Sequence, residues 1–435
     1  MMLFIPYIRK KMINKKVNEE KIFYNSKKSE VSDYQLNKFN QLWQEIQINV
    51  PFYRELINKK EAPKIITNWE DFNDLPIIDR EHVKRNIEKF SDNTREPDSW
   101  VSTGGSTGTP LKYPSWKTES KHYESNVWYA RGFYNILRSD RMFRIWGHSH
   151  TLGTGLSRYK KILTFKIGLP LIGYKRFSAY DLSDERLKNA GEQIIKFKPN
   201  YIIGYSKALQ MLAKANMDKK EEFHKLNIKA VIGAAEGFDK NGDKDFISEV
   251  FGCQVGLEYA SMETKLLAHT HPQGGYRVLW RDNIVECVDE DGHPADKGRI
   301  LVTSLYPRAF PLIRYELGDL ISGVNKNINS VYSFKEVEGR DNDFLMLDEH
   351  TPIHSEAITH AIKFSDKVTA YQIRYSKDLS NTIYIKSNET ISEEDIIEIR
   401  KRLNQIDKRL SEMKIIQVDN LKQTKAGKTK WLIEE

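Results

Sequence analysis

The chain has 435 residues, of which 39% are hydrophobic and 29% charged, as in an ordinary globular protein large enough for two domains. Its 68 Lys and Arg residues outnumber 60 Asp and Glu residues, but the basic residues are spread out and no nucleic-acid-reading motif occurs, which argues against a nucleic-acid-binding protein. The two cysteines, Cys253 and Cys287, have no metal-site spacing, and their scarcity favours a reducing, cytoplasmic location.

The N-terminal segment of residues 1–8 is apolar, but it contains Pro6 and is followed by the basic run Arg9-Lys10-Lys11. It is too short for a signal peptide or a membrane-spanning helix, and no other run approaches membrane length, so we expect no transmembrane segment. Peripheral membrane contact by this segment is one interpretation, and frayed or packed N-terminal structure is the favoured one.

Apolar residues at helical spacing predict helices over residues 33–60, with an interruption at Pro51. Asp79 is placed to cap a further short helix. That helix leads to residues 102–110, a stretch composed of Gly, Ser and Thr with a final Pro.

Residues 102–110 form the most informative stretch of the chain. Its three glycines let backbone amides turn toward an anion, and its hydroxyls add donors without bulk. It lacks the Gly-Lys-Ser/Thr ending of nucleotide P-loops, and short flanking strands predict a hairpin tip. We interpret it as a phosphate-binding loop, and an ordinary surface turn is the alternative.

Beyond this loop, predicted strands alternate with helices up to about residue 250, which indicates a mainly parallel sheet with helices on both faces. Ligands bind beyond the carboxyl ends of such strands. His148, Tyr205 and Gly233 lie at or near predicted strand ends, so we assign them to substrate binding.

From Gln254 to about residue 320, short alternating stretches with turn residues predict antiparallel β structure. Asp319 follows Gly318 and is placed either to accept two ribose hydroxyls or to form a turn. The charged stretch 334–343 predicts a boundary between domains of residues 1–338 and 339–435. In the second domain, residues 392–410 are expected to form one amphipathic helix.

These segments, in this order, resemble the adenylate-forming ligases, and in detail the phenylacetate-CoA ligase branch that includes CapK-like proteins of polysaccharide gene clusters. The likeness runs from residues 50–54 and 74–77 to Gly427 and Lys428. It implies an α/β fold with a large N-terminal domain of parallel sheets, helices and a small β-barrel-like part. It also implies a small, mobile α+β C-terminal domain that carries the catalytic lysine.

The resemblance also implies which residues bind the nucleotide. Residues 102–112 are similar to the loop over the β- and γ-phosphates of ATP, and Ala235 and Glu236 to the element beside the adenine. Residues 259–263 are similar to a motif in which a tyrosine borders the adenine and a glutamate, here Glu263, helps to hold Mg²⁺. The nucleotide-binding residues implied are Ser102, Thr103, Gly104, Gly105, Ser106, Thr107, Gly108, Lys112, Ala235, Glu236, Tyr259, Ala260, Ser261, Met262, Asp319 and Arg340.

Catalysis is assigned by the resemblance to Lys428, which would reach the reacting carboxylate and α-phosphate, and to Glu263. Asp341 and Asn342 occupy the hinge, where the branch usually shows Ser and Asp after the arginine. The glycine-containing run of the coenzyme A ligases is replaced here by residues 348–352. Adenylation is therefore expected, and coenzyme A, a sugar amine and a sugar hydroxyl are all open as acceptors.

The implied function is ATP-dependent adenylation of a small carboxylic acid, with transfer of the acyl group to an acceptor in surface polysaccharide biosynthesis. An aryl- or acyl-CoA ligase and an inactive nucleotide-binding scaffold are the alternatives. The joint presence of Glu263, Asp319, Arg340 and Lys428 argues against the scaffold. The expected protein is a monomer or homodimer that uses ATP and Mg²⁺.

Overall fold

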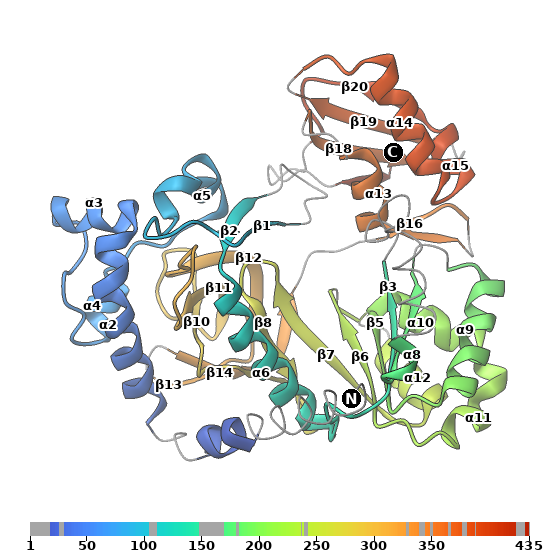
Figure 1. Cartoon of the computed structure of the whole chain (residues 1–435), viewed down its shortest axis with the longest axis horizontal. Helices are drawn as coiled ribbons and strands as arrows, with labels where there is room; N and C mark the ends of the chain where they lie inside the picture. Colours follow the sequence, from blue (N-terminus) through green and yellow to red (C-terminus); the bar gives the residue numbers. More distant parts are fainter. Residues whose placement is uncertain are drawn as a thin grey trace, which may run out of the picture.

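Figure 1 shows N-terminal helices on one side of the molecule, a large sheet in the middle and the C-terminal elements above it. The computed structural model describes residues 18–25, 30–103, 111–147, 169–179, 182–235, 237–238, 242–327, 330–338, 344–348, 351–363, 367–375, 381–387, 389–422 and 431–434. None of the helices in these ranges combines the length and the apolar character that a membrane crossing requires.

The largest sheet has nine strands in the order β13-β14-β9-β8-β7-β6-β5-β3-β4. The half from β4 to β7 is parallel, and from β8 onward the neighbours are antiparallel. Every residue of β5 and β6 is buried, as expected for central parallel strands covered on both faces. The strands are β3 (Met142–Trp146), β4 (Tyr174–Ser178), β5 (Tyr201–Tyr205), β6 (Ala230–Ala234), β7 (Gln254–Ser261), β8 (Lys265–Thr270), β9 (Tyr276–Val278), β13 (Asn325–Asn327) and β14 (Ser330–Phe334).

Alternate residues of β5 show that helices cover both faces of this sheet. Ile202 belongs to a core cluster with residues of α9, α10 and α12. Tyr201 and Ile203 instead belong to a cluster with Trp128 of α6. The helices around the sheet are α6 (Ser120–Arg131), α8 (Leu169–Leu171), α9 (Asp184–Phe197), α10 (Ser206–Ala215), α11 (Lys220–His224) and α12 (Asp243–Phe251).

A second, antiparallel sheet has the order β10-β11-β12-β15 and packs against the N-terminal helices. Arg314 fixes this contact: its guanidinium pairs with buried Glu286 at 3.1 Å and donates to the carbonyl groups of Asn73 and Leu75. The elements are α2 (Val31–Asn49), α3 (Pro51–Lys59), α4 (Trp69–Asn73), α5 (Arg80–Arg85), β10 (Asn283–Val288), β11 (Lys297–Ser304), β12 (Tyr315–Ser322) and β15 (Glu336–Glu338).

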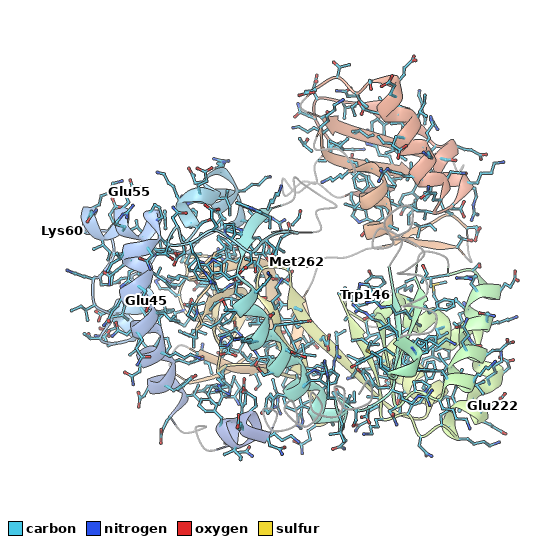
Figure 2. All side chains as sticks on the ribbon, in the orientation of Figure 1. Glu45, Glu55, Lys60, Trp146, Glu222 and Met262 are labelled. Atoms are coloured by element: carbon cyan, nitrogen blue, oxygen red, sulfur yellow. The ribbon has the colours of Figure 1, made fainter. Side chains whose placement is uncertain are left out.

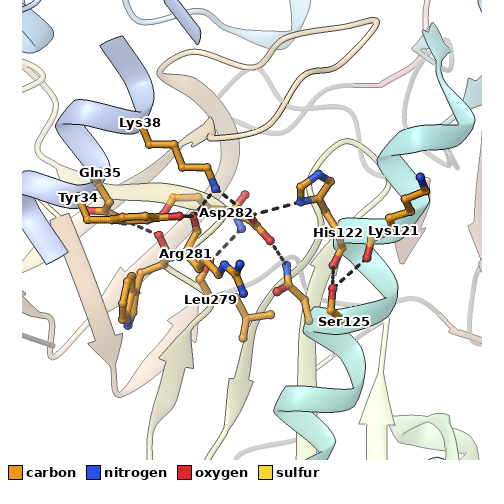
Figure 3. Close-up of polar contacts among 12 residues, drawn as sticks. Tyr34, Gln35, Lys38, Lys121, His122, Ser125, Leu279, Arg281 and Asp282 are labelled. Carbon is orange, nitrogen blue, oxygen red and sulfur yellow. Dashed lines mark hydrogen bonds and ion pairs between the residues drawn. The ribbon is translucent and has the colours of Figure 1, made fainter. Parts of the chain in front are cut away.

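A buried carboxylate, Asp282, ties α2 to α6 (Figure 3). Lys38 of α2 lies 3.2 Å from one carboxylate oxygen, and His122 of α6 lies 3.4 Å from the same oxygen. Asn126 donates to the other oxygen at 3.3 Å. Burial alone would raise the pKa of Asp282, but the hydrogen bond from His122 and the charge of Lys38 outweigh it and lower the pKa to about 2.

The C-terminal elements have a core of their own, whose buried members all come from residues 345–431. A four-stranded sheet of order β20-β19-β18-β21 packs with α13 and α14, beside the hairpin β16-β17. The elements are β16 (Phe344–Met346), β17 (Pro352–His354), α13 (Ser355–Ile362), β18 (Val368–Tyr375), β19 (Thr382–Ser387), α14 (Glu393–Asn404), α15 (Lys408–Glu412), β20 (Lys414–Gln417) and β21 (Leu432–Glu434). The division at residues 338 and 339 remains a prediction.

Most elements expected from the sequence are present, including the break at Pro51 and the strands on either side of residues 104–110. The single helix expected over 392–410 is wrong, because the chain leaves the helix after Asn404 and Asp407 caps a separate α15. Edge strand β4 was not predicted, because its sequence, Tyr-Lys-Arg-Phe-Ser, has no run of apolar residues.

Candidate active site

The base of the glycine-rich loop is a short hairpin of β1 (Ser99–Ser102) and β2 (Lys112–Ser115), in which Ser102 pairs with Lys112. Both of these residues are exposed. Thr103 closes the base: its amide donates to the Leu111 carbonyl at 2.9 Å, and its hydroxyl oxygen accepts from the Leu111 amide at 2.9 Å. The two chain ends of the loop are therefore held together. The remaining predicted loop residues, Gly104, Gly105, Ser106, Thr107 and Gly108, lie outside the described residues.

Arg80 connects this loop base to Glu263. One guanidinium nitrogen donates to the Thr103 hydroxyl oxygen at 2.6 Å, and another lies 3.6 Å from a carboxylate oxygen of Glu263. Arg80 opens α5, and Asp79 caps that helix as predicted by accepting from the His82 amide at 2.7 Å. The sequence prediction missed Arg80, although it directly follows the capping Asp79, because no local pattern shows that α5 lies beside Thr103.

Glu263 is only 5% exposed, and its surroundings hold both its backbone and its side chain. Arg308 donates to the Glu263 carbonyl at 2.6 Å, and the Tyr315 hydroxyl lies 3.5 Å from the carboxylate. The Tyr113 hydroxyl of β2 donates to the neighbouring Met262 carbonyl. One buried carboxylate beside the predicted phosphate-binding loop fits the usual Mg²⁺ site, in which substrate phosphates and water supply the other ligands.

The predicted adenine and ribose residues meet through a hydrogen bond between two different sheets. The Tyr259 hydroxyl of β7 donates to a carboxylate oxygen of Asp319 in β12 at 2.9 Å. Asp319 does not follow a turn: it lies inside β12, where the register with β11 shifts around Gly318, which has a φ of +84°. This bulge re-aims the side chains of β12, as β-bulges beside functional sites do.

Two of the three predicted substrate-binding residues, Tyr205 and Gly233, lie at or near the carboxyl ends of parallel strands. Tyr205 is buried at the end of β5, and its ring centroid lies 4.3 Å from that of Trp146 at the end of β3. A Cβ atom on Gly233 would come within 2.6 Å of both Ser206 and Phe238, so only glycine fits there. Ala235 follows β6 with a φ of +72°, a conformation rarely adopted by alanine.

Figure 2 shows Met262, just beyond β7, and Trp146 at the corresponding ends of their strands, on the side that faces the C-terminal elements. Ala260 and Ser261 complete β7 between Tyr259 and Met262, and the Ser261 hydroxyl accepts from the Thr264 amide at 3.0 Å. The motif of residues 259–263 therefore runs along the strand end that carries both Tyr259 and Glu263.

A second residue that the sequence prediction missed is Lys363, which follows α13. Burial, and then the positive charges of Lys84 and Arg80, lower its pKa to about 8. Lys363, which belongs to the C-terminal elements, is thus close enough to α5 for the positive charge of Arg80 to affect its pKa. Its only sequence signal is a basic residue at the end of an apolar helix, a common feature of helix C-termini.

Six further predicted residues cannot be placed, because they lie outside the described residues. They are His148, Glu236, Arg340, Asp341, Asn342 and Lys428.

Comparison with known proteins places this geometry in a known fold. No protein-family model matches the chain. Protein CapK of Staphylococcus aureus is 23% identical over 360 residues, which are 82% of this chain and 78% of CapK. Among solved structures, the chain is similar to 2-hydroxyisobutyryl-CoA ligase in complex with 2-HIB-AMP and CoA in the thioesterification state. The TM-score is 0.59 at 17% identity, and the match covers 94% of this chain and 90% of the ligase. Its open conformation gives a TM-score of 0.55 at 16% identity, covering 93% and 91% of the two chains.

The chain has the adenylate-forming ligase fold and is CapK-like. This fold accounts for the separate α+β elements at the C-terminal end, which the sequence resemblance implied. Within it, Arg80 links Thr103 at the loop base to Glu263, and Tyr259 of β7 is hydrogen-bonded to Asp319 inside β12; the roles assigned to these residues remain predictions.

Proposed function

We propose that this CapK-like chain is an ATP-dependent enzyme that adenylates a carboxylic acid and releases pyrophosphate. The observation that carries the proposal is the Arg80 bridge, which joins the base of the glycine-rich loop to Glu263, 160 residues farther along the chain (263 − 103). A scaffold that had lost catalysis would have no need to keep a buried carboxylate beside a phosphate-binding loop.

In the proposed reaction, a carboxylate oxygen of the acid attacks the α-phosphorus of ATP. The bond from that phosphorus to the oxygen that bridges it to the β-phosphorus breaks, and pyrophosphate leaves with the bonding electrons. The carboxylate is ionised at neutral pH and needs no general base. Catalysis therefore depends on alignment and on neutralising the phosphates.

The residues of this chain divide these tasks. Tyr259 and Asp319 would hold the adenosine, Arg80 would fix the loop through Thr103, and Glu263 would hold the magnesium of MgATP, which supplies charge neutralisation at the phosphates. Lys428, the lysine expected from the family resemblance, would approach the α-phosphate. Hinge residues Asp341 and Asn342 would let residues 339–435 carry this lysine toward residues 1–338.

The acceptor is proposed to be an amine or hydroxyl group, as on a sugar during surface polysaccharide assembly. Residues 348–352 replace the glycine-containing run expected of coenzyme A ligases, and within them Asp348 accepts from Thr351 at 2.9 Å and pairs with Arg409 of α15. Asp348 and Thr351, held by these contacts, have less freedom than glycine to move against a thiol. A coenzyme A ligase is the second candidate, because the ligase structures of this fold hold CoA.

The proposal is tested by exchange of labelled pyrophosphate into ATP, across a panel of carboxylic acids and without coenzyme A. We expect exchange with at least one acid, and a loss of about 100-fold or more in Lys428→Ala, comparable to removal of a preorganised transition-state donor. Lys425→Ala in the same basic segment is the matched control. Absence of exchange with every acid, together with no ATP binding by calorimetry, would contradict adenylation. Adding coenzyme A or a nucleotide sugar to an active mixture then identifies the acceptor.

A further inference from the structure

Two arginines stand side by side on neighbouring parallel strands. Arg144 of β3 is in register with Arg176 of β4, and both are half-buried. Along β3, half-buried Met142, Arg144 and Trp146 alternate with fully buried residues. The Arg144 guanidinium lies 4.4 Å from the centroid of the Trp146 ring. Arg144 is thereby held along the strand toward the carboxyl end, where Trp146 meets Tyr205.

Among the described residues, the carboxylate near Arg144 is already engaged by another cation. Glu258 of β7 is near Arg144, but it already pairs with buried Arg131 at 2.8 Å. Among the described residues, the Nε atom of Arg144 is buried and has no hydrogen-bond partner. Burial, and then the charges of Arg176 and Arg131, lower the pKa of Arg144. An anion beside Arg144 would remove this penalty, because an opposite charge stabilises the charged form.

The arginine pair lies near Tyr205, a predicted substrate-binding residue, because Arg144 and Arg176 each come two residues before the end of their strands. Trp146 and Tyr205 end their strands where the reacting carboxylate is expected, and Arg144 comes two residues earlier in β3. Two residues of a strand span roughly 7 Å. A short acid that extends from the strand ends along the sheet could therefore place its far end beside the guanidinium group of Arg144.

We propose that Arg144 and Arg176 bind a second anionic group on the acid substrate, so that the preferred acids are short dicarboxylic or phosphonocarboxylic acids. The inference rests on the proposed adenylation of an acid at these strand ends. A guanidinium group suits this role because its planar set of donors matches the oxygens of a carboxylate or phosphonate. A simple aliphatic or aromatic monoacid would leave the buried Nε atom without a partner.

The test compares acids that differ only in their second charge. Binding is measured by calorimetry at constant ionic strength for succinate, glutarate and adipate, for the monoamide of each, and for the corresponding phosphonocarboxylates. Wild type is expected to bind the best doubly charged acid about 30-fold more tightly than its monoamide. This factor is at the lower end of the loss in affinity when one partner of a buried, hydrogen-bonded charge pair is removed. The dicarboxylate and phosphonate arms show which anion fits better.

Arg144→Met and Arg176→Met should each abolish most of this preference, and Arg144→Lys should retain part of it because the charge remains. Arg141→Met is the matched control: Arg141 directly precedes β3, but its guanidinium lies over the Phe197 ring instead. Equal binding of diacid and monoamide by wild type, or an unchanged preference in Arg144→Met, would overturn the inference. So would binding of neither acid.

The same acids in the pyrophosphate exchange assay separate the two proposals. Arg144-dependent binding of a diacid without any exchange would uphold this site and refute adenylation. Exchange that is as fast with the monoamides as with the diacids would uphold adenylation and refute this site.

Discussion

Replacing Arg80 with methionine tests whether the loop base and Glu263 act together. In the structure the Arg80 side chain donates to Thr103 at 2.6 Å and lies 3.6 Å from the Glu263 carboxylate. Methionine keeps most of the apolar length of the side chain and removes both polar contacts. The hairpin base would remain closed, because Leu111 still donates to the Thr103 hydroxyl oxygen.

The size of the effect follows from the two contacts. A hydrogen bond from a charged donor contributes about 1.5–3 kcal/mol. The contact with Glu263 adds little, because the Arg80 side chain is 29% exposed and 3.6 Å is a long separation. If the hydrogen bond positions the loop for the transition state, kcat/KM for ATP should fall by about 10- to 150-fold.

Pyrophosphate exchange at subsaturating ATP measures this parameter, and the KM for the acid should stay constant. Arg85→Met is the matched control, because Arg85 is exposed at the other end of the same helix. Arg80→Lys should recover part of the activity. A change of less than about threefold in Arg80→Met would refute the reasoning, since it would mean that Arg80 contributes less than about 0.7 kcal/mol to the transition state.

Three further predictions concern stability and proton binding. Asp282→Asn should lower the free energy of unfolding by about 2 kcal/mol at pH 7. Because the folded-state pKa of Asp282 is depressed to about 2, this loss should persist above pH 4 and vanish as the pH falls toward 2. Urea unfolding at a series of pH values measures it. Arg314→Met should cost about 3–5 kcal/mol in the same assay by leaving Glu286 buried and unpaired, whereas the exposed Lys220→Met should cost less than about 1 kcal/mol. ATP binding at pH 8 should be accompanied by uptake of about half a proton, because the phosphates raise the pKa of Lys363 from about 8. Calorimetry in buffers of different ionisation enthalpy measures this proton uptake. Lys363→Met should abolish it.

The motifs that define the candidate site could be found in the sequence because each is local. A glycine-rich stretch needs its glycines in one turn, and Tyr259 and Glu263 are close in sequence because one strand end presents both. Alternating strands and helices likewise predicted the parallel sheet, since the hydrophobic periods of strands and helices differ. The short helix α15 was missed because the break between Asn404 and Asp407 contains no Pro or Gly.

The contacts between motifs depended on the tertiary structure. Arg80 and Lys363 come from segments with no anion-binding signature, and only the packing of the chain brings Arg80 to Thr103 and Lys363 near Arg80. The side-by-side position of Arg144 and Arg176 depends on strand β4, which the sequence did not reveal. The sequence by itself thus determined the fold class and the family resemblance, because both depend on local patterns. The charges that face a substrate were decided by strand order and register, because these bring together residues that are distant in the chain.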